Sequence, residues 1–155
     1  MFEQKEEILD EKEFWNIISM FEWKYSDDDE RVLKKAIDYL HKKSNEDIYR
    51  FYEILSKLLY DLDGIDYAKN IGECSYVDEN TYFCPDEFLY SRCVVVANGK
   101  DCYYEILKNP IKMIKDMEFE SLLYIAEDAY KMKGNEEFDY VPKYDFETFN
   151  NTDKW

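Results

Sequence analysis

The sequence has few of the residues on which common enzyme sites depend. Its 155 residues include one histidine, His41, and four scattered glycines. A Ser-His-Asp or Cys-His system needs a histidine beside the nucleophile, and a phosphate-binding loop needs clustered glycines. His41 falls near the expected end of a helix, where the helix dipole favours it for structural reasons. We therefore expect neither triad-type hydrolysis nor nucleotide-dependent chemistry.

Metal-ligand patterns are also lacking. The four cysteines are 10, 9 and 9 residues apart, with no Cys-x-x-Cys pair: Cys74, Cys84, Cys93 and Cys102. Zinc sites usually bring their ligands in close pairs. The acidic segment from Asp61 to Asp66 suggests a calcium loop, but the sixth and twelfth loop positions, which need Gly and Glu, are Asp66 and Gly72. No metal or cofactor is predicted.

Signals for secretion or membrane insertion are missing. Residues 1–7 are acidic and lack the basic and apolar regions of a signal peptide. The apolar run Cys93–Ala97 is far shorter than the ~20 residues that span a bilayer. We expect a soluble cytoplasmic protein whose reduced cysteines pack as small apolar side chains.

Basic residues are scarce, and the charge is uneven. Lys and Arg number 20 against 36 Asp and Glu, a net charge of −16. This argues against a duplex-DNA binder, because phosphate binding needs clustered Lys and Arg. Residues 1–30 carry 3 − 11 = −8 and residues 61–90 carry 1 − 8 = −7, whereas residues 31–43 carry 5 − 1 = +4. We expect the two acidic segments to form one acidic face.

The pattern of apolar residues predicts one all-α domain. Stripes at helical spacing run from Phe14 to Tyr25, from Leu33 to Leu40 and from Ile48 to Leu62. Each stripe follows a capping pair, namely Asp10 with Glu13, Ser26 with Asp29, and Ser44 with Asp47. The short turns between these segments imply antiparallel neighbours.

Shorter helices are predicted in the second half of the chain. They fall between Gly64 and Gly72, from Pro85 to the Gly99 stop, from the Asp101 cap to Lys108, at 111–115, and at 119–134. Val94–Val96 could instead be a buried strand, but no second strand pattern exists to pair with it. We predict a helical domain over residues 1–134 and an irregular aromatic and acidic arm at 135–155, either packed on the domain or partly disordered.

Arg92 interrupts the apolar helix beside Cys93 and Val94. An unpaired buried guanidinium is very costly. We therefore expect a structural ion pair with one of Asp61, Asp63, Asp66 or Asp78. The alternative is a pocket for an anionic group, built from Arg92, Asp61, Cys74 and Ser75.

The chain resembles an uncharacterised, mostly bacterial family of small helical proteins. The resemblance rests on motifs in order: Phe14-Trp15, Asp61-Leu62-Asp63-Gly64, Gly72-Glu73-Cys74-Ser75, Tyr90-Ser91-Arg92 with Gly99, and Glu120 to Tyr130. Two tryptophans of the family pattern are replaced, by Asp63 and Val94. The resemblance implies a helical bacterial cytosolic domain and brings no activity with it.

Three functions are compatible with these observations. The first is a non-enzymatic domain that binds a basic protein, such as an immunity-type inhibitor of a toxin or nuclease, with Asp78, Glu79, Asp86 and Glu87 as partner-binding candidates. The second is a small enzyme or ligand-binding module that uses the Arg92 pocket. The third is a nucleic-acid mimic that inhibits a defence protein. No direct nucleic-acid or membrane binding is expected.

Overall fold

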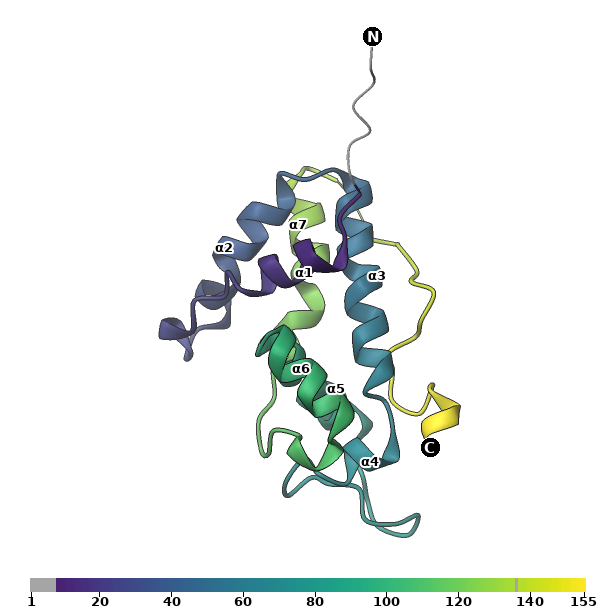
Figure 1. Cartoon of the computed structure of the whole chain (residues 1–155). Helices are drawn as coiled ribbons and strands as arrows, with labels where there is room; N and C mark the ends of the chain where they lie inside the picture. The colour runs from purple at the N-terminus through teal and green to yellow at the C-terminus, as the bar shows by residue number, and fades with distance from the viewer. Residues whose placement is uncertain (1–7, 136) are drawn as a thin grey trace.

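The computed structural model describes residues 8–135 and 137–155, and every regular element within them is helical (Figure 1). The α-helices are α1 (Glu11–Ile18), α2 (Asp29–His41), α3 (Asn45–Asp61), α4 (Ile65–Ala68), α5 (Pro85–Ala97), α6 (Lys100–Lys108) and α7 (Ile125–Met132). Short 3-10 helices form at Trp23–Tyr25, Pro110–Lys112, Glu120–Tyr124 and Thr152–Lys154. The predicted all-α fold class is confirmed.

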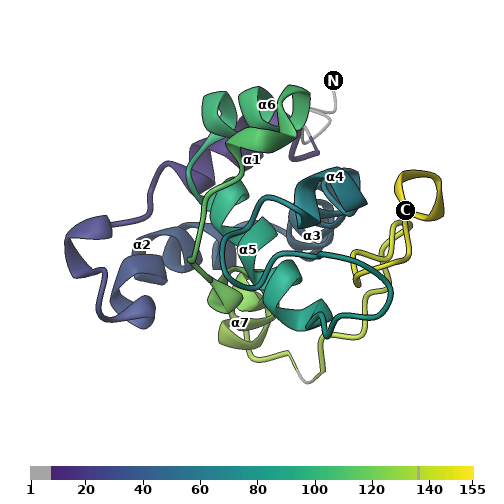
Figure 2. The same cartoon turned by 90° about the horizontal axis from the view of Figure 1, so that it is seen from below.

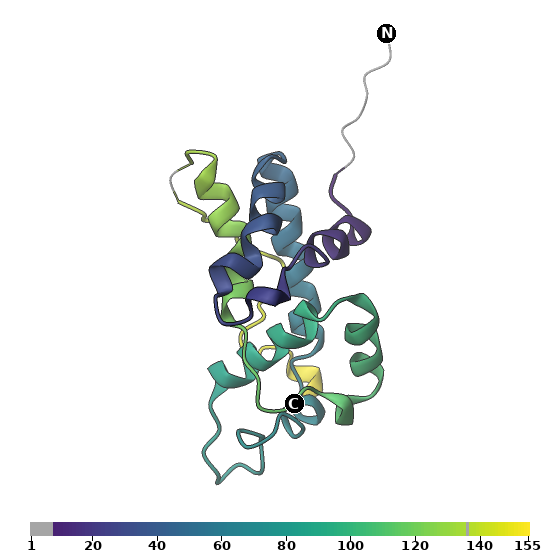
Figure 3. The same cartoon turned by 90° about the vertical axis from the view of Figure 1, so that its left-hand side faces the viewer.

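The helices form two tiers around α5. In the upper tier α7 lies between α2 and α3, and α2 packs chiefly on α7 (Figure 1). Seen from below, α5 lies in the middle, with α3, α4, α6 and α7 around it (Figure 2). Residues 69–84, between α4 and α5, form a long loop that extends from the lower tier (Figure 3).

The central position of α5 explains its sequence. Every residue from Phe88 to Ala97 is buried except half-buried Tyr90. A helix covered on all sides has no amphipathic period, which is why Val94–Val96 could also be interpreted as a strand. The structure confirms the helix, and it ends before Gly99, whose φ of +99° favours glycine.

Two of the three predicted caps form as expected. The Asp10 carboxylate accepts a hydrogen bond from the Glu13 amide at 2.8 Å, and the Ser44 hydroxyl accepts one from the Asp47 amide at 3.1 Å. These contacts span three residues, so they depend on local sequence alone.

Other helix boundaries differ from the prediction. The first helix ends at Ile18, because the chain turns there and the Glu22 amide bonds to the Val32 carbonyl. The second begins after Asp28, whose carboxylate accepts from the Arg31 amide at 3.3 Å, so the cap is not Ser26. Further on, Gly99 precedes α6 in place of Asp101, the turn predicted at 111–115 is Pro110–Lys112, and the 119–134 segment begins with a 3-10 helix.

The C-terminal arm, residues 137–155, runs along α3 and ends beside α4 (Figure 1). Its aromatic side chains Phe138, Phe146 and Trp155 pack against the core. Trp155 meets the rings of Phe149 and Phe88 at centroid distances of 4.6 and 6.0 Å. The arm thus covers apolar surface that the helices alone leave open.

No helix among the described residues has the length and apolarity needed to cross a membrane. All four cysteines are free, and only Cys93 is fully buried. Among the described residues the core is continuous from α1 to α7 and contains two charged side chains, Asp63 and Arg92.

Candidate functional site

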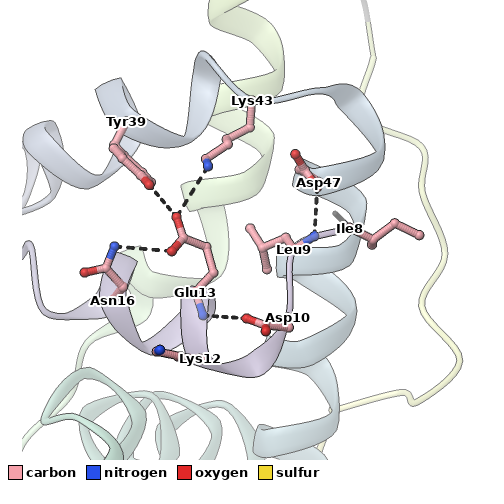
Figure 4. A pocket seen from close by; sticks show the side chains of 9 residues that line it. All are labelled: Ile8, Leu9, Asp10, Lys12, Glu13, Asn16, Tyr39, Lys43 and Asp47. Atoms are coloured by element: carbon pink, nitrogen blue, oxygen red, sulfur yellow. Dashed lines mark hydrogen bonds and ion pairs between the residues drawn. The ribbon is translucent and has the colours of Figure 1, made fainter. Parts of the chain in front are cut away.

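One surface pocket, of about 600 Å³, lies among α1, the end of α2 and the start of α3 (Figure 4). The Glu13 carboxylate is its main polar group. It accepts hydrogen bonds from the Tyr39 hydroxyl and, at 3.4 Å, from the Asn16 amide, and it pairs with Lys43 at 3.4 Å. These partners are supplied by the chain itself, so the cluster holds α1 against α2 and leaves Glu13 little capacity for a ligand.

Asp63 is fully buried at the junction of α3 and α4. Its carboxylate accepts three hydrogen bonds from the arm, from the Phe149 amide at 3.2 Å, the Asn151 amide at 3.0 Å and the Trp155 indole at 2.8 Å. Charge-assisted bonds of this kind stabilise a buried carboxylate. Asp63 therefore holds the end of the arm in place.

Arg92 lies nearby and is also 0 % exposed. Its guanidinium donates to the Leu59 carbonyl at 2.8 Å, the Phe146 carbonyl at 2.9 Å and the Thr148 hydroxyl at 3.0 Å. Burial lowers the pKa of Arg92 to about 10, and the negative charge of Asp63 opposes this shift. Both terminal nitrogens are occupied by neutral oxygens, two of them from the arm.

The expected ion pair of Arg92 is therefore wrong in its geometry. Within the described residues no carboxylate lies within 4.0 Å of the guanidinium, so Asp61, Asp63, Asp66 and Asp78 make no salt bridge with it. Asp63 is the nearest to the expectation, because its negative charge contributes most to offsetting the burial of the guanidinium. Asp63 and Arg92 thus both bind the arm but form no salt bridge with each other.

A second pocket, of about 400 Å³, is bordered by the loop after α4, by α5 and by residues 116–118. We call it the acidic pocket. Its charged lining residues are all acidic, and the lining consists of Glu73, Glu87, Asp116 and Glu118 with Ile71, Cys74, Ser91 and Met117. One side chain, Ser91, is 3 % exposed, and its hydroxyl has no hydrogen-bond partner among the described residues.

Asp116 ties the two loops of the acidic pocket together. Its carboxylate accepts from the Glu73 amide at 2.8 Å, and its own amide donates to the Ile71 carbonyl at 3.0 Å. Gly72, at φ +99°, makes this approach possible, since a Cβ there would stand 2.1 Å from Oδ1 of Asp116. The glycine of the Gly-x-Cys-Ser motif thus shapes the pocket.

The acids of the acidic pocket raise the pKa of the Cys74 thiol. A hydrogen bond with the Glu87 carboxylate, together with partial desolvation and the charges of Glu87, Glu118 and Glu73, raises the pKa of its thiol to about 11. A nucleophilic cysteine needs the opposite environment, one that favours the thiolate. Cys74 is therefore a poor nucleophile, and the pocket favours positive charge.

The structure separates the four residues of the predicted Arg92 pocket. Asp61 pairs with Lys57 at 2.6 Å, and the Ser75 hydroxyl accepts from the Ile71 amide at 2.9 Å. Cys74 lines the acidic pocket, whereas Arg92 is sealed beneath the arm. Asp66 is exposed on α4. None of five surface pockets in the described part of the chain combines Asp61, Cys74, Ser75 and Arg92.

The partner-binding candidates lie on or next to the long loop. Asp78, Glu79 and Asp86 are exposed, and Glu87 lines the acidic pocket. Of the eight acids in residues 61–90, only Asp61 forms an ion pair with a described residue. Residues 1–7 of the first acidic segment lie outside the described residues, so the single acidic face expected from the two segments stays a prediction.

Among the residues of the acidic pocket, the sequence-based candidates included only Cys74 and Glu87. They missed the other six lining residues, Ile71, Glu73, Ser91, Asp116, Met117 and Glu118. Asp116 meets Glu73 across 43 residues of sequence. No local pattern marks such a contact. Among the described residues, no group of three or more His, Cys, Asp or Glu side chains is arranged to hold a metal ion.

Comparison with known proteins identifies the family. No curated protein and no solved structure matches the chain. Residues 9–132, more than half of the chain, match the model of a family described as "Protein of unknown function (DUF4240)". The match includes Asp63, Arg92 and the acidic pocket and ends before the arm that covers the two buried charges. The chain belongs to this family, as its resemblance to an uncharacterised family implied.

Proposed function

We propose that the chain is a non-catalytic domain that binds a basic protein, in the manner of an immunity protein that inhibits a cationic bacterial toxin or nuclease. The observation that carries this proposal is the group of acids without ion-pair partners on the loop and in the acidic pocket. Glu73, Asp78, Glu79, Asp86 and Glu87 make no salt bridge with any described residue.

The acids of α1 provide a contrast. Glu13 is held by Tyr39 and Lys43, and Glu11 accepts hydrogen bonds from Trp15 and Tyr104. The carboxylates of Glu11 and Glu13 therefore have partners within the chain and contribute to the stability of the fold. The acids of the loop make no ion pair with a described residue, although Asp78 accepts hydrogen bonds from the Asn80 amide at 2.9 Å and the Thr81 hydroxyl at 2.8 Å. A cluster of uncompensated charge steers an oppositely charged partner and raises its association rate.

An enzymatic role has less support. Its candidate residues lie in different places, the pKa of the Cys74 thiol is about 11, and Arg92 is covered by the arm. A nucleic-acid mimic would also present acids, and it differs in the class of partner it captures, which would be a DNA-binding protein released by added duplex DNA.

The test compares two variants with equal net charge. In the loop variant Asp78→Asn, Glu79→Gln, Asp86→Asn and Glu87→Gln are combined; in the control Asp101→Asn, Glu137→Gln, Asp139→Asn and Asp153→Asn are combined. Each changes the net charge from −16 to −16 + 4 = −12. Both variants and the parent chain are used to capture proteins from a native lysate of the source cells at low and high salt.

The proposal predicts a basic protein that the parent and the control retain at low salt and release at high salt, because screening weakens contacts between exposed charges. The loop variant should bind it at least about tenfold more weakly. Equal retention by the loop variant and the control would contradict the proposal, as would a partner with an acidic surface.

A further inference from the structure

The acidic pocket differs from other hollows on the surface in the sign of its lining. Its four charged lining residues are all carboxylates. Four other pockets in the described part of the chain combine acids with lysine or arginine. In those pockets the charges neutralise one another, whereas a cation that enters the acidic pocket meets carboxylates alone.

Ser91 adds an observation that is independent of the acids. It lies on the inner side of the pocket, on central helix α5, and its exposed fraction is only 3 %. Its hydroxyl has no partner among the described residues. Buried hydroxyls in proteins are nearly always hydrogen-bonded, so an unpartnered one that lines a pocket points to a ligand group with hydrogen-bonding capacity.

The size and the apolar lining narrow the class of ligand. A volume of about 400 Å³ is at the lower end of the range for ligand pockets. Ile71 and Met117 provide apolar surface beside the carboxylates. A long cationic side chain matches this combination, because its methylene stem packs on apolar groups while its charged head meets the acids. A guanidinium has five donors in a plane, enough for several carboxylates and a hydroxyl.

We infer that the acidic pocket is the receptor for an arginine side chain of the basic partner, with Glu73, Glu87 and Glu118 around the guanidinium and Ser91 accepting a hydrogen bond from it. This inference rests on the proposed function and deepens it. In this arrangement the pocket holds one arginine of the partner as an anchor, and the exposed acids of the loop supply the long-range attraction.

The test uses the full chain, labelled with ¹⁵N, and short blocked peptides. The probes are acetyl-Gly-Arg-Gly-amide and the same peptide with citrulline, which keeps the shape of arginine and lacks its charge. We expect the arginine peptide to shift the amide signals of Glu73, Ser91 and Glu118, with an affinity in the millimolar range that suits one side chain. The citrulline peptide should leave these signals unchanged.

Variants locate the binding. Glu73→Gln combined with Glu118→Gln should weaken the arginine peptide by about tenfold. The matched control, Asp101→Asn combined with Asp139→Asn, removes the same charge from exposed positions outside the pocket and the loop, and it should stay within about twofold of the parent. Ser91→Ala should weaken binding by about threefold.

Equal shifts with citrulline, equal losses in the pocket and control variants, or no shift at all would overturn the pocket assignment. The proposed function fails by a different result. Suppose that the captured partner binds the loop variant more weakly than the charge-matched control, while the arginine peptide leaves the pocket signals unchanged. The domain then binds a basic protein without this pocket. If the partner binds the loop variant and the control equally well, the proposed function itself fails.

Discussion

The indole Nε1 of Trp155 donates a hydrogen bond of 2.8 Å to Oδ1 of Asp63, 92 residues earlier in the chain. Two arm amides complete the coordination of the same carboxylate. A carboxylate that is fully buried is stable only with such partners. Residues 149–155 of the arm therefore supply the hydrogen-bond donors that the buried Asp63 carboxylate needs.

Replacement of Asp63 by Asn should reveal this dependence. Asp63→Asn removes the charge that three N–H groups bind, so we expect a loss of about 3 kcal/mol in the free energy of unfolding. Trp155→Phe should cost about 2 kcal/mol, because it removes one bond to the charge and part of the ring. Urea unfolding measures both. The control is Asp66→Asn at an exposed position, which should change the free energy of unfolding by no more than about 0.5 kcal/mol. If Asp63→Asn costs no more than this control, the Asp63 charge does not hold the arm.

Two glycines with the same backbone angle provide a matched comparison. Gly72 and Gly99 both have φ of +99°, but a Cβ on Gly99 meets nothing within 4 Å, whereas one on Gly72 would overlap Asp116. Gly99→Ala should cost about 1–2 kcal/mol from backbone strain alone. Gly72→Ala should cost about 1–3 kcal/mol more, because Asp116 must move. Thermal or urea unfolding tests this, and equal losses would show that Asp116 moves aside freely.

The reactivity of Cys74 should depend on Glu87. The pKa of its thiol is about 11, so little thiolate is present at pH 8. Glu87→Gln removes the carboxylate that contributes most to raising this pKa and should raise the alkylation rate of Cys74 by about tenfold, since the thiolate is the reactive form. Peptide mapping after iodoacetamide treatment identifies the cysteine, and Glu79→Gln serves as control. An unchanged rate in Glu87→Gln would contradict the proposed field.

Stability should fall at alkaline pH because of buried tyrosines. The Tyr103 hydroxyl donates to the Leu58 carbonyl at 2.6 Å, and burial raises its pKa far above the usual value. Above pH ~10 the unfolded state loses this proton and the folded state keeps it, so the free energy of unfolding falls by about 1.4 kcal/mol per pH unit for this group. Tyr103→Phe should flatten the decline by that amount. Urea unfolding between pH 9 and pH 11 measures it, and an unchanged slope would contradict the assignment.

The parts of the fold that the sequence predicted depend on local contacts. The caps at Asp10 and Ser44 and the proline start of α5 involve residues within one helical turn. The end of α1 at Ile18 could not be predicted this way, because it depends on a bond between Glu22 and Val32 in another segment. The strand alternative for Val94–Val96 arose because complete burial removes the helical period.

The candidate site was predictable only in part. The sequence indicated that Arg92 must be compensated, since its neighbours are apolar. It could not indicate the actual partners, because the Leu59 and Phe146 carbonyls belong to the backbone and carry no signature of residue type. Glu87 was found from local charge. Ser91 and Asp116 join it only through packing of distant segments.

The ionic-strength dependence of the association rate between the full chain and its captured basic partner shows whether the exposed acids recognise that partner. Electrostatic steering by the exposed acids predicts a rate constant that falls steeply as salt is added. The dependence should be shallower for the loop variant than for the charge-matched control. A rate that does not change with salt, or changes equally for both variants, would contradict the claim that these acids recognise a basic protein.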